Sequence, residues 1–131
     1  MLVLQIDLAS TVPAYEQIAS RLRALLVDEK VVAGQQLPTV RELALDLGVH
    51  HNTVAEAYRQ LAAEGWVDLR RGRGATVLAR RLPAPTRKAH ARFTQALEEL
   101  IARGVAEGLP RGGVAAELEQ RALKLRNGAR E

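Results

Sequence analysis

The chain contains no cysteine, so it has no disulfide framework, no thiolate nucleophile and no zinc finger. Aromatic residues make up only 3% of its 131 residues, and the core is therefore expected to be aliphatic. No apolar run reaches the roughly 20 residues that a membrane-spanning helix needs. The first residues also lack the basic flank and cleavage site of a signal peptide. These absences predict a cytoplasmic protein. The length of 131 residues fits one modest domain, or a very small domain and a helical appendage.

Acidic residues are missing from a stretch in the middle of the chain. No aspartate or glutamate lies between Asp68 and Glu98, although the chain as a whole holds 15 acidic residues. The same stretch carries eight basic residues, which are Arg70, Arg71, Arg73, Arg80, Arg81, Arg87, Lys88 and Arg92. This local positive charge, together with the net charge of +4, favours nucleic acid as a partner.

The residue combinations of an enzyme are missing as well. The sequence holds no nucleophile elbow, no phosphate-binding loop and no histidine-carboxylate set with metal spacing, so we expect neither catalysis nor a cofactor. His50 and His51 are adjacent, but neighbouring residues on a helix point about 100° apart. Because no third ligand has suitable spacing, a metal site is not expected there.

The first part of the chain predicts a short strand and then a helix. Residues 2–6 are apolar and fit a strand, and Pro13 stands where a helix can begin. Apolar residues then recur at helical spacing, namely Tyr15, Ile18, Leu22, Leu25 and Leu26.

Two short helices joined by a turn are predicted next. Thr39 and Glu42 have the spacing of a capping box, which starts a helix over about residues 40–47. Gly48 ends that helix and permits a positive φ. A third helix ends at Gly65 and carries one apolar face, made of Val54, Ala57, Tyr58 and Leu61. This order of elements is a helix-turn-helix, and the small side chain of Ala44 leaves room for the partner helix.

A β-hairpin with a basic tip should follow. Residues 66–69 and 75–78 alternate like strands and flank the glycine-bearing residues 70–74, which form a wing. Residues 2–6 could add a third strand to it. Pro83 and Pro85 then mark a boundary, which divides the chain into residues 1–82 and 83–131.

The remainder predicts two helices. The first covers about residues 86–107, and its apolar stripe consists of Phe93, Leu97, Leu100, Ile101 and Val105. The second follows a break at residues 108–110, with Val114, Leu118, Ala122 and Leu125 on one side. About forty residues cannot form a core of their own, so these helices must pack against something else. The fold class is therefore mainly α with a small β-wing, a winged helix-turn-helix followed by two C-terminal helices.

Several motifs in register resemble the GntR family of bacterial regulators. They are Pro13 to Ile18, Leu37 to Ala44, Gly48-Val49, Asn52-Thr53-Val54, Ala57-Tyr58 and Gly72-Arg73-Gly74. The match in order, spacing and chemistry extends over residues 1–80. The C-terminal region looks like the YtrA-type subfamily, in which two dimerising helices replace a large effector domain. The resemblance implies a homodimeric repressor of neighbouring genes, often those of an ABC transporter.

The resemblance also assigns roles to residues. It implies that operator DNA is contacted by Arg41, by His50, His51, Asn52 and Thr53 at the start of the recognition helix, by Arg59, and by Arg71, Gly72, Arg73 and Gly74 in the wing. Two recognition helices related by a two-fold axis imply a palindromic operator. The implied dimer interface contains Phe93, Leu97, Leu100, Ile101 and Leu118. A small-molecule effector, if there is one, would bind between domains or at that interface.

This chain departs from the family pattern at three places. His50-His51 stands where the subfamily often has Asn-Pro, and Glu56 stands where arginine is common. Glu56 repels phosphate, so it either accepts a hydrogen bond from cytosine N4 or pairs with Arg59 or Arg41. The operator sequence is therefore not transferable. Residues 110–113, Pro-Arg-Gly-Gly, replace the usual start of the last helix, which predicts a late or frayed beginning.

Plainer interpretations remain for the same residues. Thr39 and Glu42 are capping residues first, and Tyr15, Tyr58 and Trp66 fit a core better than a base-stacking platform. Arg41 could be an ordinary ion-pair residue, and the arginine cluster a solvated face. The stripe beginning at Phe93 is either an internal core or a dimer interface. The alternative function is a winged-helix protein-interaction module that binds no DNA, although such a module would not need a basic wing.

Overall fold

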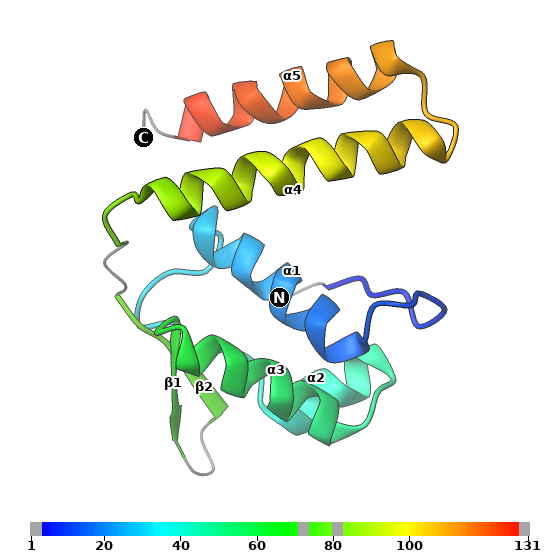
Figure 1. Ribbon diagram of the computed structural model, residues 1–131. Helices are drawn as coiled ribbons and strands as arrows, with labels where there is room; N and C mark the ends of the chain where they lie inside the picture. Colours follow the sequence, from blue (N-terminus) through cyan, green and yellow to red (C-terminus); the bar gives the residue numbers. More distant parts are fainter. Residues whose placement is uncertain (1–3, 71–73, 80–82, 129–131) are drawn as a thin grey trace. The chain divides into compact units, whose positions relative to one another are not determined.

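The computed structural model of the chain describes residues 4–70, 74–79 and 83–128. These divide into two compact units, Met1–Arg81 and Leu82–Glu131. The elements in chain order are α1 (Ala14–Val27), α2 (Val40–Leu47), α3 (His51–Ala63), β1 (Val67–Arg70), β2 (Gly74–Val77), α4 (Arg87–Ala106) and α5 (Arg111–Gly128) (Figure 1). The fold is the expected one, mainly helical with one small hairpin.

The core of the first unit forms where α1 and α2 pack against α3. Helix α1 begins directly after Pro13, whose fixed φ of −56° suits a helix start. Its apolar stripe is buried at Ile18, Ala19, Leu22 and Leu26. All the buried core residues of the described chain lie in this unit, and most of them are aliphatic, as the composition predicted.

Two of the three aromatic residues expected in the core are there. Tyr58 and Trp66 are buried, and the Tyr58 hydroxyl donates a hydrogen bond of 2.7 Å to the Pro38 carbonyl. Burial raises the pKa of the Tyr58 hydroxyl. The prediction was wrong for Tyr15, which is half-buried and outside the core. Its position on α1 lets the hydroxyl reach outward to the Glu16 carboxylate at 3.2 Å, and this hydrogen bond raises the pKa of Tyr15.

The wing is a two-stranded antiparallel hairpin in which Val67 pairs with Val77 and Arg70 with Gly74. The expected third strand is absent from the described residues 4–6 of the amino-terminal segment, so this prediction was wrong there. The loop before α2 takes its place, because Gly34 N–H donates to the Val77 carbonyl and Leu37 N–H to the Ala75 carbonyl, each at 2.8 Å. Leu4 and Ile6 instead pack their side chains against the core.

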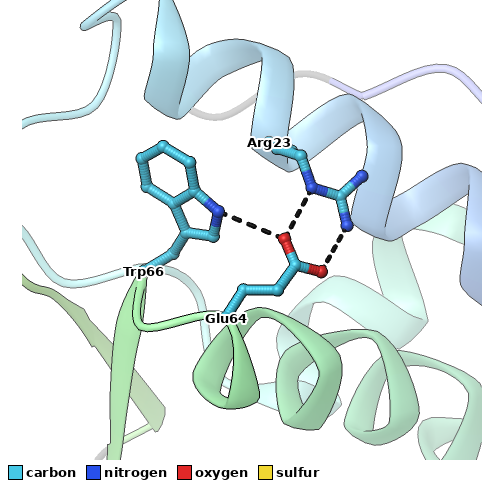
Figure 2. A network of polar contacts seen from close by, with 3 residues as sticks. All are labelled: Arg23, Glu64 and Trp66. Carbon is cyan, nitrogen blue, oxygen red and sulfur yellow. Dashed lines mark hydrogen bonds and ion pairs between the residues drawn. The ribbon is translucent and has the colours of Figure 1, made fainter. Parts of the chain in front are cut away.

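A polar network ties α1 to the end of α3 (Figure 2). Arg23 donates two hydrogen bonds to the Glu64 carboxylate, at 2.8 and 2.7 Å, and Trp66 Nε1 donates a third at 3.2 Å. The hydrogen bond to Glu64 raises the pKa of Arg23. Because the fork-shaped pair is only about one-third exposed, water competes with it less than with a surface pair.

The second unit is a hairpin of α4 and α5 that contains no buried residue (Figure 1). Thr86 caps α4 by accepting the Ala89 N–H at 3.0 Å. The prediction of a late start for α5 was wrong, because the helix begins at Arg111 and Val114 N–H already donates to the Pro110 carbonyl. Proline before the first turn prepares the backbone for a helix despite the two glycines that follow. None of the described helices has the length and apolarity to cross a membrane.

Replacing Arg23 with methionine should lower the free energy of unfolding by about 1 kcal/mol, because Glu64 would lose its bidentate partner in a partly buried place. The matched control is Arg59→Met, which breaks a pair whose side chains are 60% and 51% exposed, and it should cost less than about 0.5 kcal/mol. Denaturant titration followed by the fluorescence of Trp66, the sole tryptophan, measures the first unit directly. Equal losses in both variants would contradict the importance of this network.

Candidate nucleic-acid interface

The turn between α2 and α3 is built from backbone capping. Thr39 Oγ1 accepts the Glu42 N–H at 3.2 Å and starts α2 as the capping spacing predicted. Gly48 ends the helix in the left-handed region at φ 69°, a conformation that a residue with a Cβ resists. Val49 N–H then donates back to the Ala44 carbonyl at 3.1 Å. The chain reverses within a few residues, and α3 begins beside the end of α2.

Helix α3 has one buried face and one exposed polar face. Val54, Ala57, Tyr58 and Leu61 are buried, whereas Asn52, Glu56 and Arg59 are exposed. The exposed three are spaced by four and three residues, so they lie along one side of the helix. His50 and His51 are exposed at its start, and Thr53 is half-buried beside them. The packing of α3 therefore presents polar groups outward at its first turn.

Three arginines from different elements line one hollow of about 610 Å³ in the first unit. They are Arg41 of α2, Arg59 of α3 and Arg70 of β1. The hollow is also lined by Tyr58 and Gly74. The structure thus brings together three of the predicted site residues, Arg41, Arg59 and Gly74. Arg70 was noticed only as part of the basic stretch, and its place at the end of the first wing strand was the signal that could have singled it out.

The three arginines differ in their pairing. Arg59 contacts the Glu56 carboxylate at 2.6 Å and Arg70 contacts Asp68 at 3.0 Å, both on the exposed surface. Arg41 makes no ion pair within the described part of the chain. Of the partners considered for Glu56, the structure pairs it with Arg59. A free guanidinium and two exposed, exchangeable ones suit an anionic ligand such as a row of phosphates.

Gly74 stands where the wing approaches the loop before α2. Its φ is +70°, and an added Cβ would lie 3.4 Å from Thr39 Cα and 3.6 Å from the carbonyl oxygens of Leu37 and Pro38. The fold itself therefore favours glycine at this position, in addition to the close approach to DNA that the resemblance implies. Arg71, Gly72 and Arg73, the other wing residues of the predicted site, lie outside the described residues.

The residues predicted for a dimer interface lie on the α4–α5 hairpin. Phe93 is 65% exposed, Leu100 62% and Leu118 37%, while Leu97 and Ile101 are half-buried. Leu109 packs close to Gly104, where an added Cβ would lie 3.2 Å from the leucine side chain. The pair of helices therefore leaves most of its apolar stripe uncovered.

Metal-binding groups do not gather in the part of the chain that the structure describes, where no three histidine or carboxylate side chains come close enough to hold an ion. His50 immediately precedes α3 and His51 is its first residue. Their rings stack at a centroid distance of 4.2 Å with an angle of 30° between the planes.

The exposed start of α3, the adjoining turn and the wing define a winged helix-turn-helix protein. A model of the bacterial regulatory proteins of the gntR family matches residues 14–77. The chain is 42% identical over 72 residues to the HTH-type transcriptional repressor YtrA of Bacillus subtilis (strain 168), a match that covers 55% of each chain. It therefore spans about half the length of that relative.

Two solved structures extend this likeness. YtrA from Sulfolobus acidocaldarius, a GntR-family transcription factor, superposes with a TM-score of 0.57 at 31% identity, over 80% of this chain and 99% of that one. AraR(DBD) in complex with operator ORX1 superposes with a TM-score of 0.51 at 26% identity, over 59% of this chain and 95% of that one. This chain belongs to the GntR family and is similar to its YtrA-type members, which confirms the resemblance seen in the sequence.

Gly74→Ala and Gly48→Ala should lower the free energy of unfolding by similar amounts, about 1–2 kcal/mol, because both glycines have φ near 70°. Leucine should separate the two positions. Three backbone atoms lie within 3.6 Å of a Cβ at Gly74 and none within 4 Å at Gly48, so Gly74→Leu should be clearly the more destabilising. Trp66 fluorescence during denaturation measures all four variants, and equal losses for the two leucine variants would refute the close approach.

Proposed function

We propose that this chain is a sequence-specific, DNA-binding transcription regulator that acts as a homodimer on a palindromic operator. The observation that carries the proposal is the hollow lined by Arg41, Arg59 and Arg70 beside the exposed polar face of α3. The operator-bound AraR(DBD) has the same fold, and the GntR family to which the chain belongs consists of bacterial regulatory proteins. Both support DNA as the ligand of this surface.

In this proposal the first turn of α3 reads bases, whereas Arg41 and the wing bind phosphates. The first turn of α3 enters the major groove, where the amide of Asn52 and the hydroxyl of Thr53 reach base edges. Arg41 and the wing contact phosphates, which position the helix without reading sequence. Glu56 keeps Arg59 paired until a phosphate or base replaces the carboxylate. Asn52 is exposed and lies on the same side of α3 as Arg59, as this division requires.

Replacing Arg41 with glutamine should weaken binding to operator and random duplexes by similar factors. One phosphate contact per protomer would be lost, so the slope of log affinity against log salt should shrink by about one unit per protomer. Arg21→Gln removes an exposed arginine of α1 that does not line the hollow, and it is the matched control. Titrations at several salt concentrations decide the matter. A lower affinity for operator alone would instead make Arg41 a base reader.

Replacing Asn52 with alanine should have the opposite signature. Discrimination should fall by roughly 1–3 kcal/mol at the base that the amide reads, while random binding and its salt slope stay almost unchanged. Neutralising Arg71 or Arg73 in the wing should resemble the Arg41 variant. If the wing variants changed the base preference and Asn52→Ala did not, the two roles would have to be exchanged.

Dimerisation is assigned to the second unit, residues 83–131, and DNA binding to residues 1–82. The support is physical, because an exposed stripe containing Phe93 and Leu100 costs free energy until another surface covers it. The stripe belongs to a hairpin with no buried residue of its own. A second copy of the same hairpin supplies a matching apolar surface by two-fold symmetry.

Phe93→Asp combined with Leu100→Asp should convert the dimer into a monomer at micromolar concentration, because two charges per protomer would have to be buried. Ala91→Asp adds one such charge at an exposed position of α4, about 160° around the helix from Phe93 and about 180° from Leu100, and should leave the dimer intact. Light scattering measures both. A double variant that remained dimeric would disprove this interface.

Repression is the proposed regulatory outcome, by likeness to the HTH-type transcriptional repressor YtrA of Bacillus subtilis. A homodimer on an operator blocks access to the promoter without any catalytic step, so no enzymatic activity is proposed. The place of action is the cytoplasm, where the DNA is. Control by a small molecule stays a prediction.

A further inference from the structure

The cap at the start of α3 is an imidazole. His50 Nδ1 accepts the Asn52 N–H at 3.1 Å, and the His50 carbonyl accepts the Thr53 N–H at 3.0 Å. Helix N-caps are ordinarily the oxygen atoms of Ser, Thr, Asp or Asn. Unlike those oxygens, an imidazole nitrogen accepts a hydrogen bond only while it carries no proton, and histidine side chains change charge between about pH 5 and 8.

The surroundings of His50 leave its ring open to solvent protons. Within the described residues, the His50 ring contacts the Asn52 amide and the His51 ring. The two ring centroids are 4.2 Å apart. The charged groups of the two packed helices are Arg41, Glu42 and Asp46 on α2, and Glu56 and Arg59 on α3. Within the residues that the structure describes, none of these side chains pairs with either imidazole. Both rings are exposed.

We propose that His50 is a positioning residue whose neutral ring holds the first turn of α3 in its base-reading geometry, so that protonation of His50 reduces discrimination between operator and other DNA. The inference rests on the proposed function, because it assigns base reading to Asn52 and Thr53. It differs from the family resemblance, which implies only that His50 contacts DNA.

Three effects of a proton on His50 act in the same direction. The Nδ1–H would face the Asn52 N–H, so two donors would oppose each other where a hydrogen bond had been. A positive charge would stand at the positive end of the α3 dipole. Protonation of His51 as well would place two cations in one stack. All three loosen residues 51–53, which carry the proposed base readers.

Absolute affinity does not isolate this effect. A protonated histidine beside DNA attracts phosphates of any sequence, so binding to all duplexes rises with the added charge. The ratio of operator affinity to random-duplex affinity cancels that shared attraction. What remains in the ratio is the effect of the first-turn geometry on base reading. A neutral ring accepts the Asn52 N–H and a protonated ring does not, so the ratio should fall on acidification.

The experiment uses the full chain and two probes. One is a duplex that the protein selects from a randomised pool at about pH 8, and the other is a shuffled duplex of the same length and composition. The ratio of the two affinities is measured from about pH 8 to about pH 5.5, the range over which histidine titrates. We expect it to fall by at least about twofold per half-site, which corresponds to the lower end of what an N-cap contributes. Trp66 fluorescence verifies that the first unit stays folded.

Three variants separate His50 from its neighbour. His50→Asn supplies a capping oxygen that does not titrate, so its ratio should be independent of pH. His50→Gln, a poor cap, should have a low ratio at every pH. His51→Gln removes the stacked ring and leaves the cap, so the fall on acidification should persist. A second readout needs no DNA, because acidification that breaks the cap should move the Asn52 amide resonance in the wild type and not in His50→Asn.

The outcomes distinguish this inference from the proposed function. A protein that selects no duplex from the pool, or binds selected and shuffled duplexes alike at every pH, contradicts sequence-specific binding itself. Specific binding with a ratio that does not change with pH overturns only the role of His50. A fall that persists in His50→Asn, or that disappears in His51→Gln, likewise overturns it.

Discussion

The burial of one face of α3 against α1 and α2 is the packing on which the candidate site depends. Val54, Ala57, Tyr58 and Leu61 are at most 1% exposed, and removing one large side chain from such a place costs about 2–5 kcal/mol. A helix fixed along one side has no freedom to rotate, so its opposite side is fixed as well. The orientation of Asn52 toward solvent is therefore a consequence of the core, although Asn52 is not itself part of it.

The same helix also fixes the hollow beside it. The Tyr58 hydroxyl holds the Pro38 carbonyl, and Gly74 approaches the same short loop from the wing. Helix α3, the loop before α2 and strand β2 thus meet around residues 37–39, with Leu37 N–H bonded to the Ala75 carbonyl. Because these contacts involve backbone atoms, the positions of Arg41, Arg59 and Arg70 around the hollow depend little on surface side chains.

Sequence reasoning succeeded where the signal was local. The limits of α2, the turn at Gly48 and the buried face of α3 follow from capping chemistry and helical spacing within a few residues. It failed where the answer depended on distant partners. The amino-terminal segment has the composition of a strand, yet the edge of β2 is occupied by residues 34–37, and no local pattern reveals which segment arrives there.

The same distinction between local and distant signals applies to the candidate site. The residues at the start of α3 were identifiable from the order of motifs, whereas the meeting of Arg41 with Arg59 and Arg70 needed the tertiary structure. Glu56 shows the reason clearly, because its spacing to Arg59 was visible in the sequence but Arg41 was an equally open partner. The choice depends on side-chain positions, and the structure places Arg59 Nη2 at 2.6 Å from Glu56.

Under the proposed DNA-binding function, the ion pairs beside the hollow affect how the surface would distinguish one DNA from another. Exposed pairs such as Arg59–Glu56 and Arg70–Asp68 contribute about 0–1 kcal/mol each, so a phosphate can replace the carboxylate at little cost. Until that happens, each carboxylate offsets the charge of its arginine and weakens the attraction for arbitrary DNA. Of the three arginines that line the hollow, Arg41 is the one without an ion pair in the described part of the chain, so its charge is not offset. A fit close enough to displace both carboxylates then adds attraction that a poor fit does not obtain, which makes part of the electrostatic attraction depend on correct docking.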